Sequence, residues 1–427
     1  MIKEINMPKA YLKNKKLLVL GGSTQMINLT LLAQSLGCEV HVLDYYSTVQ
    51  SPAKLIADAY SDLSIFDTEA VVSYIKENNI DGVITGYTDS YLFQYKEICE
   101  KAGLPYYGSD ESFGIGVDKM LFKQACIKSN VGIIPGTNAY DFDTVVKFAE
   151  KNGYPLMLKP TDNSGSRGVI KCEKEEDLKD CYEYALSFSK SKNVIVERFM
   201  QCDSIGVSYQ LQGKDIYLSA MCDRFVYKTK NGSAITSETQ YPSKYLKRFI
   251  ESEDANLRRL FRDNNFKDGV VAVMGYVDDD GFYWCEMTYR PSGGHHYTFI
   301  NDQVGVNGLA LLIEYAVTGK TESYDPKKET PFFKDRCGMV HIQGVPNGFV
   351  SRVEGVDTIR SMSNVLEVAE DKQVGQTIGD EGTTAQNLLS VWIKAETWEK
   401  YFALIREIES VYKVFDEEGN NLVIKRR

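Results

Sequence analysis

The sequence predicts an α/β protein of several domains. Its 427 residues are too many for one average hydrophobic core and suggest two to four domains. Residues 17–108 alternate short apolar strands with helical segments, which is typical of a parallel sheet covered by helices. From 155 to 171, an apolar strand, a loop rich in glycine and serine, and a second strand follow one another, as in a hairpin that binds phosphate.

The expected N-terminal sheet begins with a strand at 17–20, and the chain turns at 21–22 into a helix. The two glycines of this turn lack the G-x-G-x-x-G spacing of a dinucleotide-binding fingerprint, so a tight turn explains them. Asp44, Thr85 and Asp89 lie at the ends of strands, where ligands of such sheets bind. Because Asp and Thr are ordinary capping residues, we favour turns and helix caps for these three.

The rest of the chain shows a different order of elements. Residues 116–198 are expected to form helix, strand, loop, strand, helix and strand in turn. The segment that follows is richer in strands and contains long helical patterns at 246–261 and 308–317. From about residue 325, short strands and turns precede one further helix at 396–411.

The loop after the strand that ends at Lys159 has the chemistry of an anion site. Gly165 and Gly168 allow the backbone to approach a bulky anion, and the hydroxyls of Ser164 and Ser166 can grip phosphate oxygens. Lys159 follows apolar residues, so its charge needs a partner, which an ATP phosphate would supply. The loop leads to a strand rather than a helix, so it is not a Walker-type loop. An ordinary glycine-rich hairpin is the competing interpretation.

Three further segments strengthen the nucleotide interpretation. A helix begins near Lys119, and an apolar strand ends at Glu197. A later strand carries Glu286, Thr288 and Arg290 at alternate positions, which share one face. That face therefore combines a metal-type oxygen ligand, a second oxygen and a cation.

The order and spacing of these motifs resembles the ATP-grasp superfamily, in its carboxylate–amine ligase branch, which includes carbamoyl-phosphate-synthetase-like and amino-acid ligases. The resemblance covers roughly residues 15–320 and implies an ATP-grasp fold, with a Rossmann-like domain before it and a C-terminal α+β tail. The implied divisions are a Rossmann-like domain at 1–115, a small ATP-grasp lobe at 116–198, a large lobe at 199–324 and a C-terminal domain at 325–427.

The resemblance also assigns residues to ATP. It gives the two lysines to the phosphates, Glu197 to the adenine amino group, and the backbone of Arg198 and Phe199 to the other adenine edge. The ribose-binding acid of the family is absent, so Asp203 or Ser204 serves instead or the contact is missing. The residues expected to bind ATP are Lys119, Lys159, Ser164, Gly165, Ser166, Gly168, Glu197, Arg198, Phe199 and Asp203.

The expected metal site departs most from the family. Glu286 is kept, Thr288 replaces an asparagine, and Met274 stands where the other acid belongs. A thioether is a poor ligand for Mg²⁺, which prefers oxygen. The aspartates of the turn at 278–280 fit a solvated hairpin better than replacement ligands. We therefore expect Mg²⁺ to bind weakly, or mostly through phosphates and water.

The resemblance makes Arg290 the group that stabilises the transition state. Arg224 is expected to hold a carboxylate or phosphate in the cleft, with a surface ion pair to Asp223 as an equal alternative. His295 and His296 lack partners at zinc-ligand spacing, so a role for one of them in the cleft wall and ordinary packing of both are equal alternatives. The turn expected to bind a substrate carboxylate through its N–H groups contains Ser292, Gly293 and Gly294.

The function implied by the resemblance is an ATP-dependent, ADP-forming ligase. It would activate a small carboxylate as an acyl phosphate and join it to an amine, such as an amino acid. The departures at the metal and ribose positions leave an alternative: an ATP-binding pseudoenzyme or a regulatory subunit. A third interpretation is a subunit that works only inside a biosynthetic complex.

Composition restricts the partners. Apolar residues make up 43% and charged residues 25% of the chain, as in soluble globular proteins, and the net charge is −10. Such a balance argues against nucleic acid, which needs a basic surface. The number of cysteines, nine, is odd, and the sequence contains no C-x-x-C motif. Both observations indicate free thiols in a reducing compartment. We expect a cytoplasmic protein with no membrane span, with a homodimer as the assembly to consider.

Overall fold

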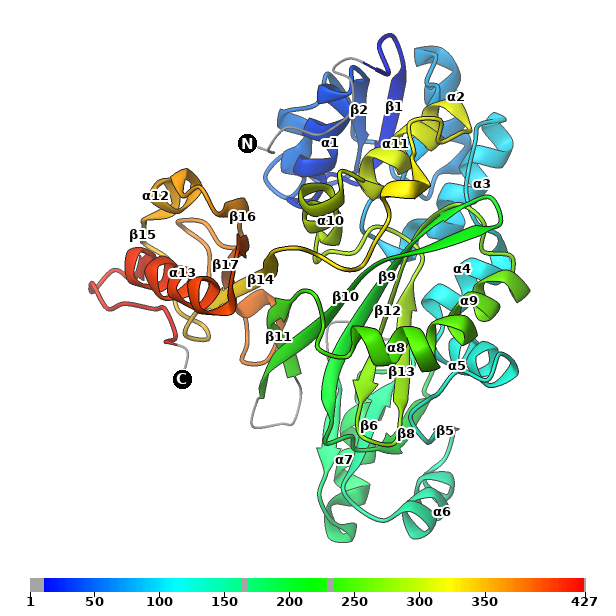
Figure 1. Cartoon of the computed structure of the whole chain (residues 1–427), viewed down its shortest axis with the longest axis vertical. Coiled ribbons are helices and arrows are strands. Elements are labelled where there is room, and N and C mark those ends of the chain that lie inside the picture. Colours follow the sequence, from blue (N-terminus) through cyan, green and yellow to red (C-terminus); the bar gives the residue numbers. More distant parts are fainter. Residues whose placement is uncertain (1–10, 163–166, 229–233, 426–427) are drawn as a thin grey trace.

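The computed structural model describes residues 11–162, 167–228 and 234–425. The expected phosphate-loop residues Ser164, Gly165 and Ser166 lie outside these ranges. Figure 1 shows the N-terminal sheet at one end of the long axis and a small sheet at the other, with long strands between them. The C-terminal segment, in orange and red, lies to one side of these strands.

The N-terminal unit is a parallel sheet with helices, as the alternating pattern predicts. Its strands have the order β3-β2-β1-β4 and pair in parallel. The first strand reads Lys-Leu-Leu-Val-Leu and is almost wholly buried, as expected for a parallel strand covered on both faces. The elements are β1 (Lys16–Leu20), α1 (Met26–Ser35), β2 (Glu39–Leu43), β3 (Ala59–Ser61), α2 (Thr68–Asn78), β4 (Gly82–Ile84) and α3 (Leu92–Ala102).

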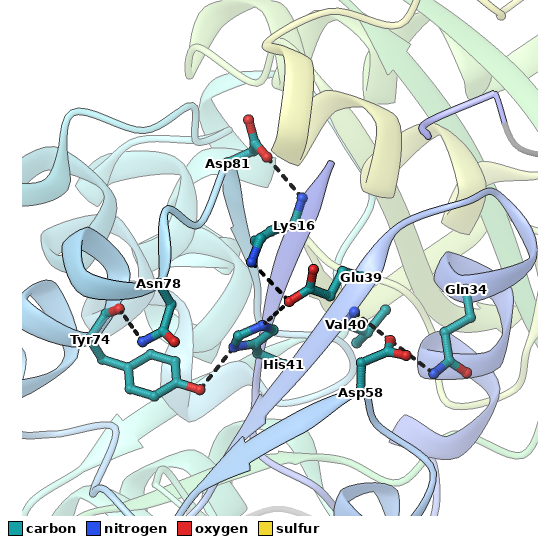
Figure 2. Close-up of polar contacts among 9 residues, drawn as sticks. All are labelled: Lys16, Gln34, Glu39, Val40, His41, Asp58, Tyr74, Asn78 and Asp81. Atoms are coloured by element: carbon teal, nitrogen blue, oxygen red, sulfur yellow. Dashed lines mark hydrogen bonds and ion pairs between the residues drawn. The ribbon is translucent and has the colours of Figure 1, made fainter. Parts of the chain in front are cut away.

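A polar network occupies the amino ends of these strands (Figure 2). His41 is buried, and its ring nitrogens lie 2.8 Å from the Tyr74 hydroxyl and 2.9 Å from a Glu39 carboxylate oxygen. The same oxygen pairs with the Lys16 ammonium at 2.9 Å. All these polar groups satisfy one another. The network therefore links β1 and β2 to α2, which carries Tyr74.

The small lobe is a helix pair followed by a four-stranded antiparallel sheet of order β5-β8-β6-β7. Helices α6 and α7 pack on this sheet around a core of aliphatic residues, cysteines and Tyr182. The elements are α4 (Asp110–Val117), α5 (Lys119–Lys128), β5 (Gly136–Ala139), α6 (Phe142–Asn152), β6 (Leu156–Pro160), β7 (Ile170–Cys172), α7 (Leu178–Ser187) and β8 (Val194–Arg198).

The large sheet has eight strands in the order β13-β12-β9-β10-β11-β14-β17-β16. Helices α8 and α9 pack on one of its faces, and α10 packs on part of the other. The helix expected at 246–261 is two helices, because Glu253 leaves helical geometry and its buried carboxylate accepts hydrogen bonds from Gly132 N and Trp284 Nε1. The elements of this part are β9 (Asp203–Gln212), β10 (Asp215–Lys228), β11 (Ala234–Gln240), α8 (Leu246–Ser252), α9 (Asp254–Asp263), β12 (Gly269–Val277), β13 (Phe282–Thr288), α10 (His296–Val304) and α11 (Gly308–Thr318).

The C-terminal segment continues the large sheet. Strands β14, β17 and β16 join it beyond β11, and α12 and α13 cover a separate hydrophobic cluster. The boundary expected at 324/325 stays a prediction, although the sheet runs across it. The elements are β14 (Arg336–Gln343), β15 (Arg352–Glu354), α12 (Val356–Ser361), β16 (Val365–Glu370), β17 (Asn387–Ala395), α13 (Trp398–Val411) and β18 (Lys413–Phe415).

Helix α11 joins the large sheet to the N-terminal unit. It is apolar and mostly buried, and it packs on β4 (Figure 1). A Cβ at Gly82 would collide with the Ala316 carbonyl, so this close packing requires glycine. No helix in the described part of the chain is long and apolar enough to cross a membrane.

Candidate functional site

One face of the large sheet packs on α8 and α9, and the other carries polar side chains and contacts α10 over part of its area. On β9, Ile205, Val207 and Tyr209 lie in the core that includes α8 and α9. Alternate residues of a strand point to opposite faces, so Ser204 and Ser208 lie on the other side. We call this second side the cleft face.

Strand register gathers the expected metal ligands and one arginine on the cleft face. Met274 of β12 pairs with Glu286 of β13, and Thr288 lies two residues farther along β13 on the same side. Across the neighbouring strand, Ser204 pairs with Arg224 of β10. The Arg224 guanidinium donates to the Ser204 hydroxyl at 3.4 Å. Four elements of the expected site therefore meet on one surface.

The metal-type oxygens are present but few. The Thr288 hydroxyl is buried and has no hydrogen-bond partner among the described residues, and Glu286 has no hydrogen bond or ion pair with them. No cluster of three or more His, Cys, Asp or Glu side chains suited to a metal occurs in the described ranges. In the turn, Asp278 accepts the Gly281 N–H at 3.1 Å, as in a hairpin. Glu286 and Thr288 therefore fit an ion that takes its other ligands from phosphate and water.

A buried triad of charges lies in the small lobe. Both oxygens of Glu197 form ion pairs, one with Lys123 and one with Lys159, and the carboxylate is almost fully buried. Burial alone would raise the pKa of Glu197, but the two ammonium groups hold it below its ordinary value. Burial alone would lower the pKa of Lys159, but Glu197 raises it, with smaller contributions from Cys285 and Tyr276 on the large sheet. The triad therefore lies where the small sheet approaches the large one.

Lys123 is the residue of this triad that the sequence interpretation missed. It follows Lys119 by four positions, so both lie on one side of α5. This spacing is the sequence feature that could have identified Lys123. Asp118 caps the helix by accepting the N–H groups of Met120 and Leu121. Lys159 pairs with Glu197, whereas the partner expected from the sequence was an ATP phosphate.

The remaining expected ATP contacts divide into two groups. The backbone N–H groups of Arg198 and Phe199 already donate to the carbonyls of Pro135 and Pro155, at 3.0 and 3.1 Å. Asp203 lies on the helix-covered face, where Lys244 and the Tyr245 hydroxyl bind its carboxylate. Ser204 therefore remains the better placed ribose candidate of the pair, because it lies on the cleft face. Gly168 adopts φ +77°, which favours glycine.

Arg224 and Arg290 have partners other than those expected from the sequence. Asp223 accepts hydrogen bonds from Ser243 and from Lys244 N, so the surface ion pair between Asp223 and Arg224 is not formed. Arg290 forms a two-pronged pair with Asp89, through Nε at 2.7 Å and Nη2 at 2.5 Å. The interpretation of Asp89 as a helix cap is wrong, since no side-chain cap occurs at this helix start. The N-terminal unit thus supplies a carboxylate to the cleft.

The turn after Arg290 is held by its neighbours. The Gly294 N–H donates to the Ser292 hydroxyl at 3.2 Å, and the Gly294 carbonyl accepts from Trp392 Nε1 at 2.9 Å. His295 stacks on Trp392 and pairs with the Glu367 carboxylate at 2.7 Å. The Trp392 and Glu367 contacts come from the C-terminal segment.

His296 is the histidine that faces the cleft. It contacts the Ser208 hydroxyl at 2.7 Å, and burial, with a smaller contribution from the Arg224 guanidinium, lowers its pKa to about 4, so it is neutral near pH 7. It borders a pocket between the cleft face, α10 and the start of α11. The pocket is also lined by Arg290 and Ser292.

Comparison with known proteins identifies this arrangement. Residues 118–206 match the family described as the carbamoyl-phosphate synthase L chain, ATP binding domain. The crystal structure of an L-amino acid ligase from Bacillus licheniformis has a TM-score of 0.78 to this chain, with 14% identity, and covers 95% of this chain and 99% of that one. The chain has the ATP-grasp fold. The predicted fold class and the resemblance to the ATP-grasp superfamily are confirmed.

Two further ATP-grasp similarities extend over most of the chain. Formate-dependent phosphoribosylglycinamide formyltransferase from Bacillus subtilis is 24% identical over 318 residues, which are 73% of this chain and 80% of that protein. The biotin carboxylase domain of Hydrogenobacter thermophilus 2-oxoglutarate carboxylase, in complex with MgADP and bicarbonate, has a TM-score of 0.76 at 16% identity. That comparison covers 96% of this chain and 91% of that domain.

Proposed function

We propose that this protein is an ATP-dependent ligase, which activates a small carboxylate as an acyl phosphate and joins it to an amine, with release of ADP and phosphate. The observation that carries the proposal is the pairing of two surfaces. Lys159 of the small lobe, joined to Lys123 through Glu197, approaches a cleft face that presents Glu286, Thr288 and Arg224. Cations beside metal-type oxygens and a further arginine suit the transfer of a phosphoryl group.

In this proposal the residues of the chain act in sequence. A substrate carboxylate oxygen attacks the γ-phosphorus while the bond to the ADP oxygen breaks, and Lys159 compensates the charge on the phosphates. The amine then attacks the acyl carbon, phosphate leaves with the bonding electrons, and the amine proton passes to water or phosphate. Arg290 stabilises the developing oxyanion with its guanidinium. For this step the guanidinium must leave its ion pair with Asp89 and contact the oxyanion instead.

Magnesium would be held by Glu286 and Thr288 and would neutralise charge on the transferred phosphoryl group. The thioether of Met274 adds no hard ligand, so the metal contributes through fewer protein oxygens than two acids and an asparagine would provide. The enzymes found in the comparisons include a ligase, a formyltransferase and a biotin carboxylase, and they give no support to the pseudoenzyme alternative.

A screen for ATP consumption tests the proposal. The purified chain with ATP and Mg²⁺ is incubated with pairs of small carboxylates and amines, amino acids included, and ADP and phosphate are measured together. The proposal predicts equal amounts of ADP and phosphate that depend on both substrates, and trapping of the acyl phosphate by hydroxylamine. Release of AMP, or ADP formation without either substrate, would refute this reaction type.

A further inference from the structure

A half-buried glutamate lies in the pocket wall, and one of its carboxyl oxygens is buried without a hydrogen-bond partner among the described residues. Glu329 follows the short turn Pro326–Lys328 and contributes to the pocket wall. Its Oε1 accepts a hydrogen bond from the Tyr324 hydroxyl at 3.3 Å. Its Oε2 is buried and accepts no hydrogen bond from the described residues. Burial raises the pKa of Glu329 to about 7, even though the hydroxyls of Ser219 and Tyr324 lower it.

The charge in the pocket is unbalanced. Among the described residues that line it, Glu329 is the sole acid and Arg290 the sole strong base, while His296 is neutral near pH 7. Asp89 already compensates Arg290 through two hydrogen bonds. Glu329 has no ion pair with the described residues. The pocket therefore presents one carboxyl that lacks a counter-charge.

The other walls of the pocket are mostly apolar. They come from β12, α10 and the start of α11, and include Val270, Ile300 and Leu309. Apolar walls exclude water, so an uncompensated carboxylate among them is costly and a cation that pairs with it is favoured. An ammonium group has three donors and can satisfy the free Oε2 and a nearby hydroxyl together.

We infer that a substrate of this protein carries a positively charged amino group, which binds to Glu329 while an apolar part of the substrate packs on the pocket walls. This inference rests on the proposed ligase function and names the substrate class: an amino acid or another small molecule with a primary ammonium group. Val270 precedes Met274 by four residues on β12, which is about 13 Å of strand. Glu329 is thus a specificity-determining residue at a distance from the transferred phosphate.

The experiment compares Glu329→Gln with the wild type and with Glu322→Gln. Glu322 lies in the same segment, and its side chain is 68% exposed, so its replacement is a matched control. The first measurement uses butylammonium chloride as the probe, with n-butanol as its uncharged counterpart and no ATP present. Butylammonium should raise the Tm of the wild type and the control, and should leave Glu329→Gln unchanged. Butanol should have no such selective effect.

The second measurement is turnover. For each amino-bearing compound that supports ADP formation, kcat/KM is compared with that of its N-acetyl derivative. Acetylation should lower kcat/KM of the wild type about 100-fold, and Glu329→Gln should lower it by a similar factor on the free amine, because a buried charge pair is lost. The KM for ATP should stay the same. Glu329→Asp, which keeps the charge, should recover part of the activity.

The two measurements separate this inference from the ligase proposal. If butylammonium stabilises the wild type and not Glu329→Gln, and no substrate pair consumes ATP, the amine site stands and the ligase proposal fails. If substrates without an amino group are turned over, and Glu329→Gln processes them as the wild type does, the ligase stands and the amine site is refuted. Equal stabilisation of the wild type and Glu329→Gln by butylammonium also refutes it. A Gln variant that fails to fold, beside a folded Asp variant with wild-type discrimination, supports it.

Discussion

Replacing Glu197 by glutamine removes the carboxylate that two buried lysines share. The side chains of Glu197 and Lys123 are 3% and 5% exposed, so water cannot take over the lost charge pairing, whereas Lys159 is 18% exposed and is partly solvated. Glutamine has nearly the same shape and still accepts one hydrogen bond. The substitution therefore isolates charge from packing in the core of the small lobe.

The size of the effect follows from burial. Breaking a buried ion pair by removing one partner costs about 3–5 kcal/mol, because the other charge is left without compensation. Glu197 serves two lysines, but the exposed part of Lys159 recovers some hydration, so we expect a loss of about 3–5 kcal/mol rather than twice that value. This loss equals a change of roughly 10²·² to 10³·⁷ in a local opening constant.

Native-state hydrogen exchange measures this loss without assuming that a chain of several lobes unfolds in one step. Peptides covering β6 and β8 should lose protection in Glu197→Gln. Peptides of the N-terminal sheet should not change. Glu176→Gln is the control in the same lobe, since its side chain is 76% exposed and its pair with Lys174 is long, at 4.0 Å.

The direction in which this stabilisation changes with pH follows from the pKa shift of Glu197. The folded pKa of Glu197 lies below its ordinary value, so its stabilisation is complete above the unfolded pKa of about 4.5 and is lost as pH falls through the folded value. The difference between wild type and variant should therefore shrink below pH 4.5. A variant that matches the Glu176→Gln control at pH 7 would refute the reasoning that the triad is strongly coupled.

Three further predictions concern the proposed reaction. Lys159→Ala should weaken ATP binding strongly in calorimetry, whereas Lys171→Ala, on the adjacent strand β7, should not; equal affinities would remove Lys159 from the phosphate site. Arg290→Ala should keep ATP affinity and lower kcat by orders of magnitude at saturating substrate, and a near-normal kcat would contradict its transition-state role. Met274→Glu should tighten Mg²⁺-dependent ATP binding, because a carboxylate beside Glu286 restores a hard ligand; a magnesium titration with no gain, in a variant of unchanged Tm, would show that another group completes the site.

Local patterns in the sequence predicted much of the fold. The alternation of strands and helices identified the N-terminal sheet, and the glycine-rich hairpin identified the small lobe. The break at Glu253 was missed, because its cause is a contact with Trp284 on another strand rather than a helix breaker in the sequence. Long-range pairing of this kind carries no local signal.

The site likewise combines features that local sequence patterns predict with contacts that only the folded chain reveals. Alternation along β13 placed Glu286 and Thr288 together, as predicted, because strand periodicity is a local property. The partner of Arg290 was not predictable, since Asp89 lies 201 positions away. Glu329 carried no motif at all, and its interest comes from burial, which only the folded chain reveals.

The continuity of the large sheet decides how the chain can be divided. Tyr241 and Cys337 exchange two backbone hydrogen bonds, at 2.8 and 3.0 Å, and so join β11 to the strand that follows the boundary expected at 324/325. A chain shortened to residue 324 would leave β11 with a bare edge and would uncover the apolar side chains that pack on β14 and β17. Bare edges of this kind pair with other chains. Such a fragment would self-associate, and the two parts would have to be produced together to remain in solution as a folded protein.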